Sequence, residues 1–384
     1  MSLLSMYPIF VYPILLLFLT KNKRISGRDE LPETIHSNQF PFISFVISAY
    51  NEESVIRAKL ESIKSIDYPK DKFEVILVLD YPNDKTESIA KAASYDFLKI
   101  FSLDERRGKT FCQNVGVANA SGEAIFFTDA NTIIDPQAPK RMVLRLLSSD
   151  DIGCVTGNLS YFKDEFSGEG KYQSLENLIK ILETQLHSSI GANGGIYCIR
   201  KSDFIPLDET LLSDFVEPLE IYRRYKKVTY FEKDAYAFEQ APDSSNLIDI
   251  FHRKLRILVR SLHAMKYLRD LLNPFKFPLM AFEIISHKLI KWLSPMFVLI
   301  INILFLFTSK RFAVLFFVVE FVLVLFSIIG LIFFKNNKRP KFLYLLSYIF
   351  LVNLAGIVGW IYFILGKNIT VWQVKREDPK NIKL

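Results

Sequence analysis

Acidic side chains follow two apolar segments of this 384-residue chain, at positions where they could act on a phosphorylated substrate. Asp80 ends the run Phe73–Leu79, and Asp129 follows the run Ala124–Phe127, with Asn131 two residues later. At the carboxyl end of a strand, an Asp and a second oxygen ligand two residues on can hold Mg²⁺ or Mn²⁺ against a diphosphate. An Asp that only stabilises the next turn is the alternative interpretation of this pattern.

Basic residues between these acids could bind the phosphate groups of such a ligand. The segment Ser48–Glu53 marks a change from an apolar run to a helical pattern, and turns of this kind carry ligand groups. Within Asp104–Thr110, Gly108 permits close backbone approach, while Arg107 and Lys109 supply positive charge. A basic loop that is only solvated is the alternative.

The apolar runs that end in these polar groups have the composition of buried parallel strands. Helical patterns alternate with them, and the first helix is expected to begin near Glu52. The alternation predicts an α/β domain with a Rossmann-like sheet. Because the carboxyl ends of parallel strands share one crevice, Asp80, Asp84 and Asp129 are expected to meet around a cation.

The order of these motifs resembles that of membrane-bound family 2 glycosyltransferases, in a branch that lacks the Q-x-x-R-W motif. The resemblance covers nearly the whole chain and rests on the order of eight segments rather than on any one of them. These segments are Ser48–Glu53, Leu79–Asp80 with Asp84, Arg107–Lys109 with Asn114, Thr128–Thr132, Gly191–Arg200, Leu212–Val216, Phe251–Arg256 and Ser286–Trp292.

The resemblance implies a GT-A fold, which is a Rossmann-like mixed sheet, and transfer of a sugar with inversion at the anomeric carbon. It also implies a nucleotide-diphosphate sugar donor, with a UDP-sugar favoured, and Mg²⁺ or Mn²⁺ as cofactor. Asp80 would contact the base or ribose, Asp129 the metal-bound diphosphate, and Asp214 would be the general base. The alternative for Asp214 is an N-cap of the helix that follows it.

The same resemblance assigns binding residues to the donor, the acceptor and the metal. The expected donor-binding residues are Ala49, Tyr50, Asn51, Glu52, Asp80, Asp84, Arg107, Lys109, Asp129, Arg253, Lys254 and Arg256. The acceptor is expected at Asn193, Gly194 and Gly195, and the metal at Asp129 and Asn131.

This sequence departs from the family pattern at two places. Asn131 stands where many members have a second Asp, so the neutral oxygen should bind a metal more weakly or through water. Ile257 follows Arg256 where processive members have the Trp of Q-x-x-R-W. The basic residues of this segment could bind a diphosphate, or the segment could be an amphipathic anchor at a membrane interface.

Apolar runs near both ends of the chain predict a multi-pass membrane protein. The N-terminal run Leu3–Thr20 is interpreted as an uncleaved anchor rather than a signal peptide. Further spans are expected at Trp292–Thr308, Phe312–Phe334 and Phe342–Leu365. The predicted organisation is an anchor (1–24), a GT-A domain (41–242), amphipathic interface helices (243–291), a transmembrane region (292–366) and a basic tail (367–384).

Charge predicts the orientation of the protein in the membrane. The basic cluster Lys21–Arg28 places the catalytic domain on the cytoplasmic side, as in a bacterial inner membrane. A simple crossing by the last run would leave the basic tail outside. Asn353, Gly356 and Gly359 interrupt that run, so a re-entrant hairpin is the alternative.

Composition limits the partners of the protein. The net charge of +7 lies largely beside the apolar runs, which favours contact with membrane lipids over nucleic acid. Three scattered cysteines and five histidines suggest neither a disulfide framework nor a zinc site. A transporter is disfavoured because Glu320 stands alone among apolar residues.

The sequence therefore predicts an inverting glycosyltransferase that acts on a lipid-linked or glycan acceptor at the cytoplasmic membrane face. A processive polysaccharide synthase is one alternative. The other is a catalytically silent scaffold with partners in glycan assembly.

Overall fold

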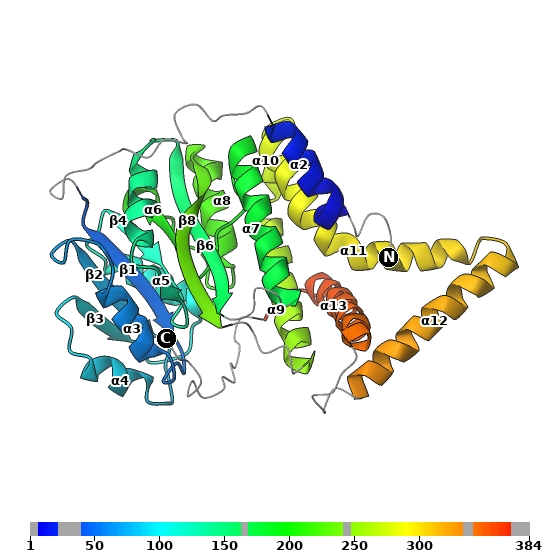
Figure 1. The fold of residues 1–384 in the computed structure, drawn as a ribbon, viewed down its shortest axis with the longest axis horizontal. Coiled ribbons are helices and arrows are strands. Elements are labelled where there is room, and N and C mark those ends of the chain that lie inside the picture. Colours follow the sequence, from blue (N-terminus) through cyan, green and yellow to red (C-terminus); the bar gives the residue numbers. More distant parts are fainter. Residues whose placement is uncertain (1–6, 22–39, 163–167, 241–246, 333–340, 370–384) are drawn as a thin grey trace. The chain divides into compact units, whose positions relative to one another are not determined.

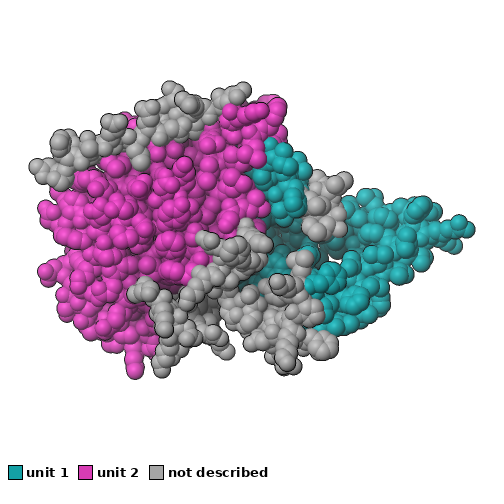
Figure 2. Space-filling model, in the orientation of Figure 1, with its two compact units in different colours: residues 1–14, 242–267, 281–369 teal, residues 15–241, 268–280, 370–384 magenta. Residues whose placement is uncertain are grey.

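The computed structural model describes residues 7–21, 40–162, 168–240, 247–332 and 341–369. The chain divides into two compact units, which Figure 2 shows in different colours. The helical unit comprises residues 1–14, 242–267 and 281–369, and the sheet unit comprises residues 15–241, 268–280 and 370–384. Most of the predicted basic tail lies outside the described residues.

The sheet unit is built on one eight-stranded sheet with the order β3-β2-β1-β4-β7-β6-β8-β5 (Figure 1). Its first four strands are parallel, as the alternating sequence pattern predicts. They are β1 (Ile43–Ala49), β2 (Phe73–Leu79), β3 (Leu98–Ser102) and β4 (Ala124–Phe127). Their continuous apolar composition follows from burial on both faces of the sheet.

The other half of the sheet is mixed. β7 pairs antiparallel with both β4 and β6, β6 runs parallel to β8, and β5 pairs antiparallel with β8 at the edge. These strands are β5 (Ile133–Ile134), β6 (Ile152–Phe162), β7 (Tyr197–Arg200) and β8 (Val228–Gln240). The predicted α/β class with a mixed sheet is thus confirmed.

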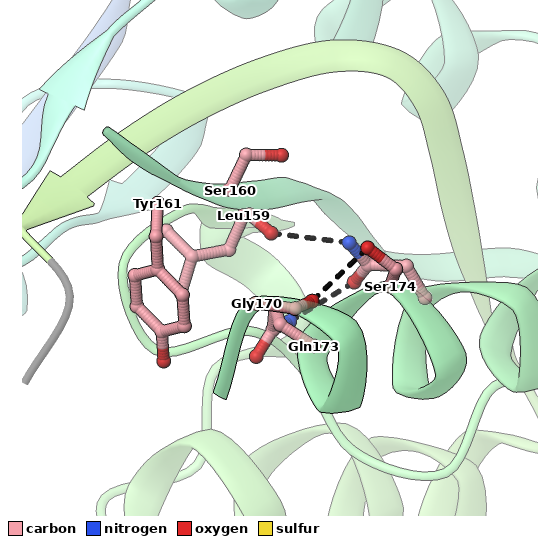
Figure 3. A pocket seen from close by; sticks show the side chains of 7 residues that line it. Leu159, Ser160, Tyr161, Gly170, Gln173 and Ser174 are labelled. Atoms are coloured by element: carbon pink, nitrogen blue, oxygen red, sulfur yellow. Dashed lines mark hydrogen bonds between the residues drawn. The ribbon is translucent and has the colours of Figure 1, made fainter. Parts of the chain in front are cut away.

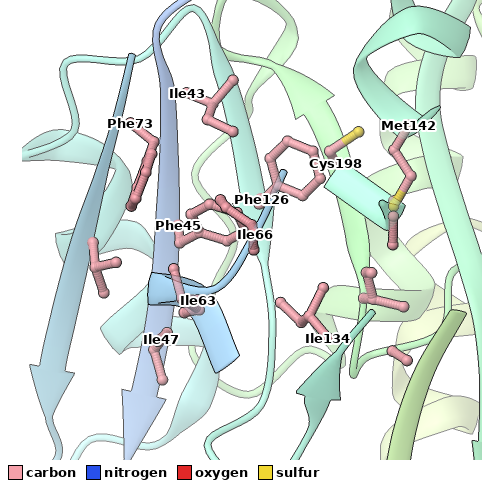
Figure 4. Packing of buried hydrophobic residues seen from close by; sticks show 14 of the residues in the cluster. Ile43, Phe45, Ile47, Ile63, Ile66, Phe73, Phe126, Ile134, Met142 and Cys198 are labelled. Carbon is pink, nitrogen blue, oxygen red and sulfur yellow. The ribbon is translucent and has the colours of Figure 1, made fainter. Parts of the chain in front are cut away.

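Helices cover both faces of this sheet, because alternate residues of each buried strand point to opposite faces. On one face, Phe45 and Ile47 of β1 pack with Ile63 of α3 and with Phe126 of β4 (Figure 4). On the other face, Val46 packs in a second apolar cluster. The helices are α3 (Ile56–Lys64), α4 (Thr86–Ala92), α5 (Lys109–Ala118), α6 (Ala138–Leu147), α7 (Gly168–Leu186), η3 (Lys201–Asp203) and α8 (Ser213–Tyr225).

The turn after β1 is longer than the sequence pattern predicts. α3 begins at Ile56 rather than near Glu52, because Asn51 adopts a left-handed backbone conformation with φ 53°. Tyr81, directly after Asp80, has φ 55° and turns the chain in the same way. Asn tolerates this conformation better than most residues, whereas an aromatic residue there is uncommon.

Three helices among the described residues are long and apolar enough to cross a membrane: Pro278–Phe305, Lys310–Leu331 and Leu346–Ile364. All but the first three residues of Pro278–Phe305 belong to the helical unit. The described part of the N-terminal run, Tyr7–Thr20, is a shorter apolar helix. The elements of the end regions are η1 (Tyr7–Val11), α2 (Tyr12–Thr20), α9 (Leu247–Tyr267), η4 (Arg269–Leu272), α10 (Pro278–Ile284), η5 (Ile285–Leu289), α11 (Ile290–Phe305), α12 (Lys310–Ile332) and α13 (Lys341–Ile364).

The last apolar run is one continuous helix, so the re-entrant hairpin considered for this run is wrong. A Cβ at Gly356 would lie 2.2 Å from the Pro295 side chain of α11, so this glycine permits close helix packing. Glu320 is also less isolated than expected, since the Asn302 side-chain amide donates to its Oε1 at 3.1 Å. A small residue in a predicted span here marks a contact between helices, not a break.

Candidate active site

The loops after β1 and β2 are joined by side-chain hydrogen bonds. The Asn51 amide nitrogen donates to Asn83 Oδ1 at 2.6 Å, and the Asn83 backbone N–H donates to Asn51 Oδ1 at 2.9 Å. Asp84 accepts from the backbone N–H groups of Glu53 and Thr86. These contacts fix the segment containing Ala49, Tyr50, Asn51 and Glu52, four of the predicted donor-binding residues.

Asp80 holds the loop between β3 and α5. Its carboxylate accepts from the backbone N–H of Arg107 at 2.7 Å and from that of Gly108 at 3.0 and 3.1 Å. Gly108 has φ 89°, a conformation that favours glycine. Asp80 is 5% exposed, so its most evident contribution is to shape this loop.

The basic loop that Asp80 holds has two arginines with different partners. The Arg106 guanidinium stacks on Tyr50, with 3.6 Å between its central carbon and the ring centroid. Arg107 instead pairs with Glu209 at 2.9 Å and lies over the Phe111 ring. The predicted phosphate ligand Arg107 therefore links two loops in this structure, and the stacked Arg106 is a residue that the sequence pattern missed.

Lys109 begins α5 and connects three parts of the site. Its ammonium donates to Asp129 Oδ1 at 2.5 Å and to the carbonyl oxygen of Gly194 at 3.4 Å. Burial alone would lower the pKa of Lys109, but the charges of Asp129 and Asp214 outweigh burial and raise it. Lys109 is therefore a firmly charged cation between the predicted diphosphate side and the predicted base.

Asp214 lies in the first turn of α8, one residue inside the helix. Leu212 is the N-cap and makes no side-chain capping bond, so the N-cap alternative for Asp214 is wrong. Asp214 Oδ1 is buried and has no hydrogen-bond partner among the described residues. A Cβ at Gly194 would lie 2.6 Å from Asp214 Oδ2, so this glycine leaves room directly beside the carboxylate.

A second carboxyl group lies one turn further along α8. Glu217 is 2% exposed, accepts from the Tyr197 hydroxyl at 3.0 Å through Oε2, and its Oε1 has no partner among the described residues. Burial raises the pKa of Glu217 to about 8, although the Tyr197 bond opposes this shift. With this raised pKa, Glu217 is a weaker candidate for an ionised base at neutral pH.

Lys59 is a buried lysine behind the Asp129 loop that the sequence interpretation missed, and burial lowers its pKa to about 7 although the charge of Asp129 opposes this shift. Its ammonium is 0% exposed and donates to Thr128 Oγ1 at 2.6 Å and to the Thr132 carbonyl oxygen at 2.7 Å. Its position, three residues after Ile56 and four before Ile63, places it on the buried face of α3. That helical spacing is the signal that could have revealed it.

Glu239, at the end of β8, is an acidic residue of the site that the sequence pattern did not reveal. It accepts from Thr132 Oγ1 at 2.5 Å, and a Cβ at Gly195 would lie 2.8 Å from its Oε1. Thr128 Oγ1 donates to the Gly195 carbonyl oxygen at 2.6 Å. The predicted acceptor segment is thus attached to both ends of the Asp129 loop.

The remaining predicted acceptor residue, Asn193, is buried and held by hydrogen bonds to neighbouring elements. It is 7% exposed, its backbone N–H donates to Thr156 Oγ1 at 2.8 Å, and its side-chain amide donates to the Gly157 carbonyl oxygen at 2.6 Å. Lys180 of α7 donates to its Oδ1 at 2.6 Å. These bonds orient the neighbouring glycines of the segment toward Asp214 and Glu239.

A small polar cavity lies between the end of β6 and the start of α7 (Figure 3). Its volume of about 30 Å³ is enough for a water molecule but not for a sugar ring. The lining residues are Leu159, Ser160, Tyr161, Gly170, Gln173, Ser174 and Asn177. This cavity therefore does not locate the substrate.

The residues present fit a metal that is completed by its substrate, rather than a metal held by protein alone. No three His, Cys, Asp or Glu side chains in the described ranges are grouped to hold an ion. The expected meeting of Asp80, Asp84 and Asp129 around a cation is therefore wrong, because the first two bind backbone N–H groups. The half-buried Asp129 and Asn131 still offer hard oxygen ligands, which suit Mg²⁺ or Mn²⁺ when phosphates supply the rest.

The predicted diphosphate ligands Arg253, Lys254 and Arg256 lie on α9 in the helical unit. The other predicted residues lie in the sheet unit, so the structure does not test a joint role for the two groups. The assignment of these three cations to the donor stays a prediction.

Comparison with known proteins agrees with this geometry. Residues 44–204, which contain β1 to β7 and the Lys109–Asp129 pair, match the family model described as glycosyl transferase family 2. The chain contains a family 2 glycosyltransferase domain. The predicted family and enzyme class are thereby confirmed for this domain. The matched region ends before Asp214.

Relatives of this chain include poly-beta-1,6-N-acetyl-D-glucosamine synthases. The protein from Staphylococcus epidermidis is 31% identical over 180 residues, 46% of this chain and 43% of the relative. That from Staphylococcus aureus strain COL is 27% identical over 214 residues, 53% of this chain and 51% of the relative. The chain spans about half the length of these curated relatives.

A solved structure extends the likeness to nearly the whole chain. A mannosyltransferase from Pyrobaculum calidifontis, in complex with GDP-Man and Mn²⁺, matches with a TM-score of 0.66 at 19% identity. The match covers 95% of this chain and 100% of that chain. The predicted GT-A fold with additional helices is thus confirmed.

Proposed function

We propose that this protein transfers a sugar, with inversion, from a nucleotide-diphosphate sugar to a lipid-linked or glycan acceptor at the cytoplasmic face of a membrane. The observation that carries the proposal is the placement of Lys109 between Asp129 and the carboxylate of Asp214. An inverting displacement needs a base on one side of the anomeric carbon and charge neutralisation on the other.

In this proposal, the Asp214 carboxylate accepts the proton of the acceptor hydroxyl, and its Oδ1 has no competing hydrogen-bond partner among the described residues. Gly194 leaves the space in which that hydroxyl approaches the carboxylate. Lys109, with its raised pKa, stays charged and stabilises the negative diphosphate as the glycosidic bond to it breaks. A positioned base of this kind contributes roughly 10²–10⁴-fold to a rate.

Asp129 and Asn131 would hold Mg²⁺ or Mn²⁺ together with the diphosphate of the donor. The bound ion would supply further charge neutralisation for the leaving group. Thr128 and Thr132, which Lys59 binds, fix the loop that presents both ligands. We favour a UDP-sugar because the curated relatives are named as N-acetylglucosamine polymer synthases.

A screen of nucleotide sugars with the purified full-length protein tests this function. Release of a nucleoside diphosphate from one donor, dependent on divalent metal and abolished by Asp214→Asn in the presence of acceptor, is expected. Intact nucleotide binding without any donor turnover across the screen would instead favour a catalytically silent scaffold.

A processive polysaccharide synthase is the second candidate, and the names of the curated relatives favour it. Ile257 stands beside Arg256 in place of an aromatic residue, which favours transfer of one or a few sugars. The length of the product separates these two candidates.

A further inference from the structure

The loop between η4 and α10 in the sheet unit presents one aromatic side chain to solvent and buries another. Phe275 is 96% exposed, whereas Phe277 is 2% exposed. Asn273 fixes both, because its Oδ1 accepts from the Phe275 N–H at 2.9 Å and its carbonyl oxygen from the Phe277 N–H at 2.9 Å. The exposure of Phe275 is therefore built into a hydrogen-bonded turn.

Phe277 attaches this loop to the end of α8. Its ring lies 6.0 Å from the Tyr222 ring, and the Lys226 ammonium lies 3.8 Å from the Phe277 ring centroid. Lys226 ends α8 in a left-handed conformation with φ 61°. The loop and the end of the helix thus form one surface, defined here by Lys226, Phe275 and Lys276 and named the Phe275 surface.

The Phe275 surface carries two cations with no anion between them. Lys276 lies 5.2 Å from the Phe277 ring that Lys226 also contacts. Partial burial and the charge of Lys276 lower the pKa of Lys226, although Asp270 opposes this shift. Among the described residues, no carboxylate lies within ion-pair distance of either lysine, and Asp270 itself binds Arg223 at 3.4 Å. An external anion would relieve this repulsion.

The chain itself links the Phe275 surface to a membrane. Pro278, the next residue after Phe277, begins the helical segment Pro278–Phe305 that is long and apolar enough to span a bilayer. An exposed aromatic residue flanked by Lys, directly before such a segment, is the composition that anchors proteins at a lipid interface. This continuity favours a lipid surface over a soluble phosphate or another protein.

We propose that the Phe275 surface is a lipid-binding site at which Phe275 enters the headgroup region of the bilayer and Lys226 and Lys276 bind phosphates of anionic lipids. The site supports the proposed function but does not depend on its sugar chemistry. α8 runs from Ser213 to Tyr225, so the candidate base Asp214 lies roughly 17 Å along the same helix from the lipid contact. Anchoring the end of α8 would hold Asp214 at a set height above the membrane, where a lipid-linked acceptor emerges.

The test places a fluorescent label at position 275 of the full-length protein in nanodiscs. The native Cys112, Cys154 and Cys198 are buried, so Phe275→Cys can be labelled selectively. Lys91→Cys, on α4, is the matched control because Lys91 is a solvent-exposed lysine outside the Phe275 surface. Both variants receive the same small label. All discs contain the same fraction of a doxyl-labelled lipid, in either phosphatidylcholine alone or a mixture of phosphatidylcholine and phosphatidylglycerol.

The label at position 275 is expected to be quenched at least about twofold more by doxyl lipid than the label at position 91, and more strongly in anionic discs. Adding Lys226→Gln and Lys276→Gln should weaken the binding that depends on anionic lipid by about fivefold per lysine, because one basic residue is attracted to such a surface by about 1 kcal/mol. Equal access of aqueous iodide to both labels, with no lipid quenching at position 275, would overturn the proposal. Quenching that is the same in neutral and anionic discs, and in the double lysine variant, would overturn it as well.

A second measurement guards against an effect of the label. In the unlabelled protein, amide hydrogen exchange of the segment 273–277 should slow in anionic discs compared with detergent, and the double lysine variant should lose this protection. Unchanged exchange in both proteins would contradict lipid binding. Nucleotide binding measured on the same samples separates this outcome from failure of the transferase proposal, because the Phe275 surface contains none of the predicted donor residues.

Discussion

The Lys109 ammonium lies 2.5 Å from Asp129 Oδ1 and within the electrostatic field of Asp214. One cation therefore connects the side of the site proposed for the leaving diphosphate with the side proposed for the base. Lys109 begins α5, Asp129 follows β4 and Asp214 lies in α8, so only the folded sheet brings these groups together.

The two acids beside Lys109 should produce different defects when they are changed. Asp129→Ala should weaken donor and metal binding, because it removes the charged metal ligand of the proposed site. Asp214→Asn should leave donor binding near normal and lower transfer by roughly 10²–10⁴-fold, since only the base is lost. Calorimetric titration with nucleotide and a transfer assay measure the two effects separately. Substantial transfer by folded Asp214→Asn would require another base, and Glu217 would be the next residue to examine.

Gly194→Ala should impair catalysis more than stability. The added methyl group would lie 2.6 Å from Asp214 Oδ2 and 3.2 Å from Lys109 Nζ, so it must displace one of these side chains. Gly153→Ala is the control, because its methyl group would meet Ile221 outside the site. We expect Gly194→Ala to lose most transfer with a small change in apparent melting temperature, and Gly153→Ala to show the opposite pattern. Normal transfer by Gly194→Ala would show that this space is not used.

Lys59→Met should weaken metal binding without touching the proposed ligands. The substitution keeps a long side chain but removes the hydrogen bonds to Thr128 and Thr132 that fix the Asp129 loop. Loss of such supporting contacts typically lowers metal affinity by about 10–100-fold. Titration of Mn²⁺ in the presence of nucleotide, followed by electron paramagnetic resonance, measures this affinity. Lys70→Met, which removes an exposed lysine from the following loop, should bind Mn²⁺ as the unmodified protein does.

Glu217 should make the stability of the protein depend on pH. Its folded pKa of about 8 lies above the ordinary glutamate pKa of 4.5, so the folded state binds more protons than the unfolded state between these values. Stability from this group is thus present below about pH 4.5 and is lost as pH rises through about 8. Glu217→Gln keeps an acceptor for Tyr197 and cannot ionise. Apparent melting temperatures between pH 5 and 8.5 should therefore fall less steeply in the variant, and parallel curves would refute the assignment.

The product of this protein should contain one or a few added sugars. Ile257 offers no aromatic face to a sugar, and loss of one stacking contact costs roughly 1 kcal/mol, which shortens acceptor residence several-fold. Membranes that contain only this protein, incubated with the correct labelled donor, allow the product to be sized over time. Long polymer at early times, while most acceptor remains unextended, would instead establish the processive alternative. Ile257→Trp should lengthen the product if this contact limits it.

The sequence by itself determined the elements that carry the site. β1, β2 and β4 are buried on both faces, so their apolar runs and the polar residues at their ends could be recognised without a structure. The three apolar runs near the C-terminus were equally evident, because length and composition alone specify a helix that can span a membrane. The order of the motifs then indicated the family.

Only the tertiary structure decided which of these polar groups face each other. Asp80 and Asp84 were expected at a cation, yet both bind backbone N–H groups, because the turns beside them present unpaired donors. Lys59 and Glu239 reach the Asp129 loop from a helix and a strand that are far away in the sequence. Contacts of this kind depend on packing across the sheet, for which a single sequence carries no local signal beyond the helical spacing of Lys59.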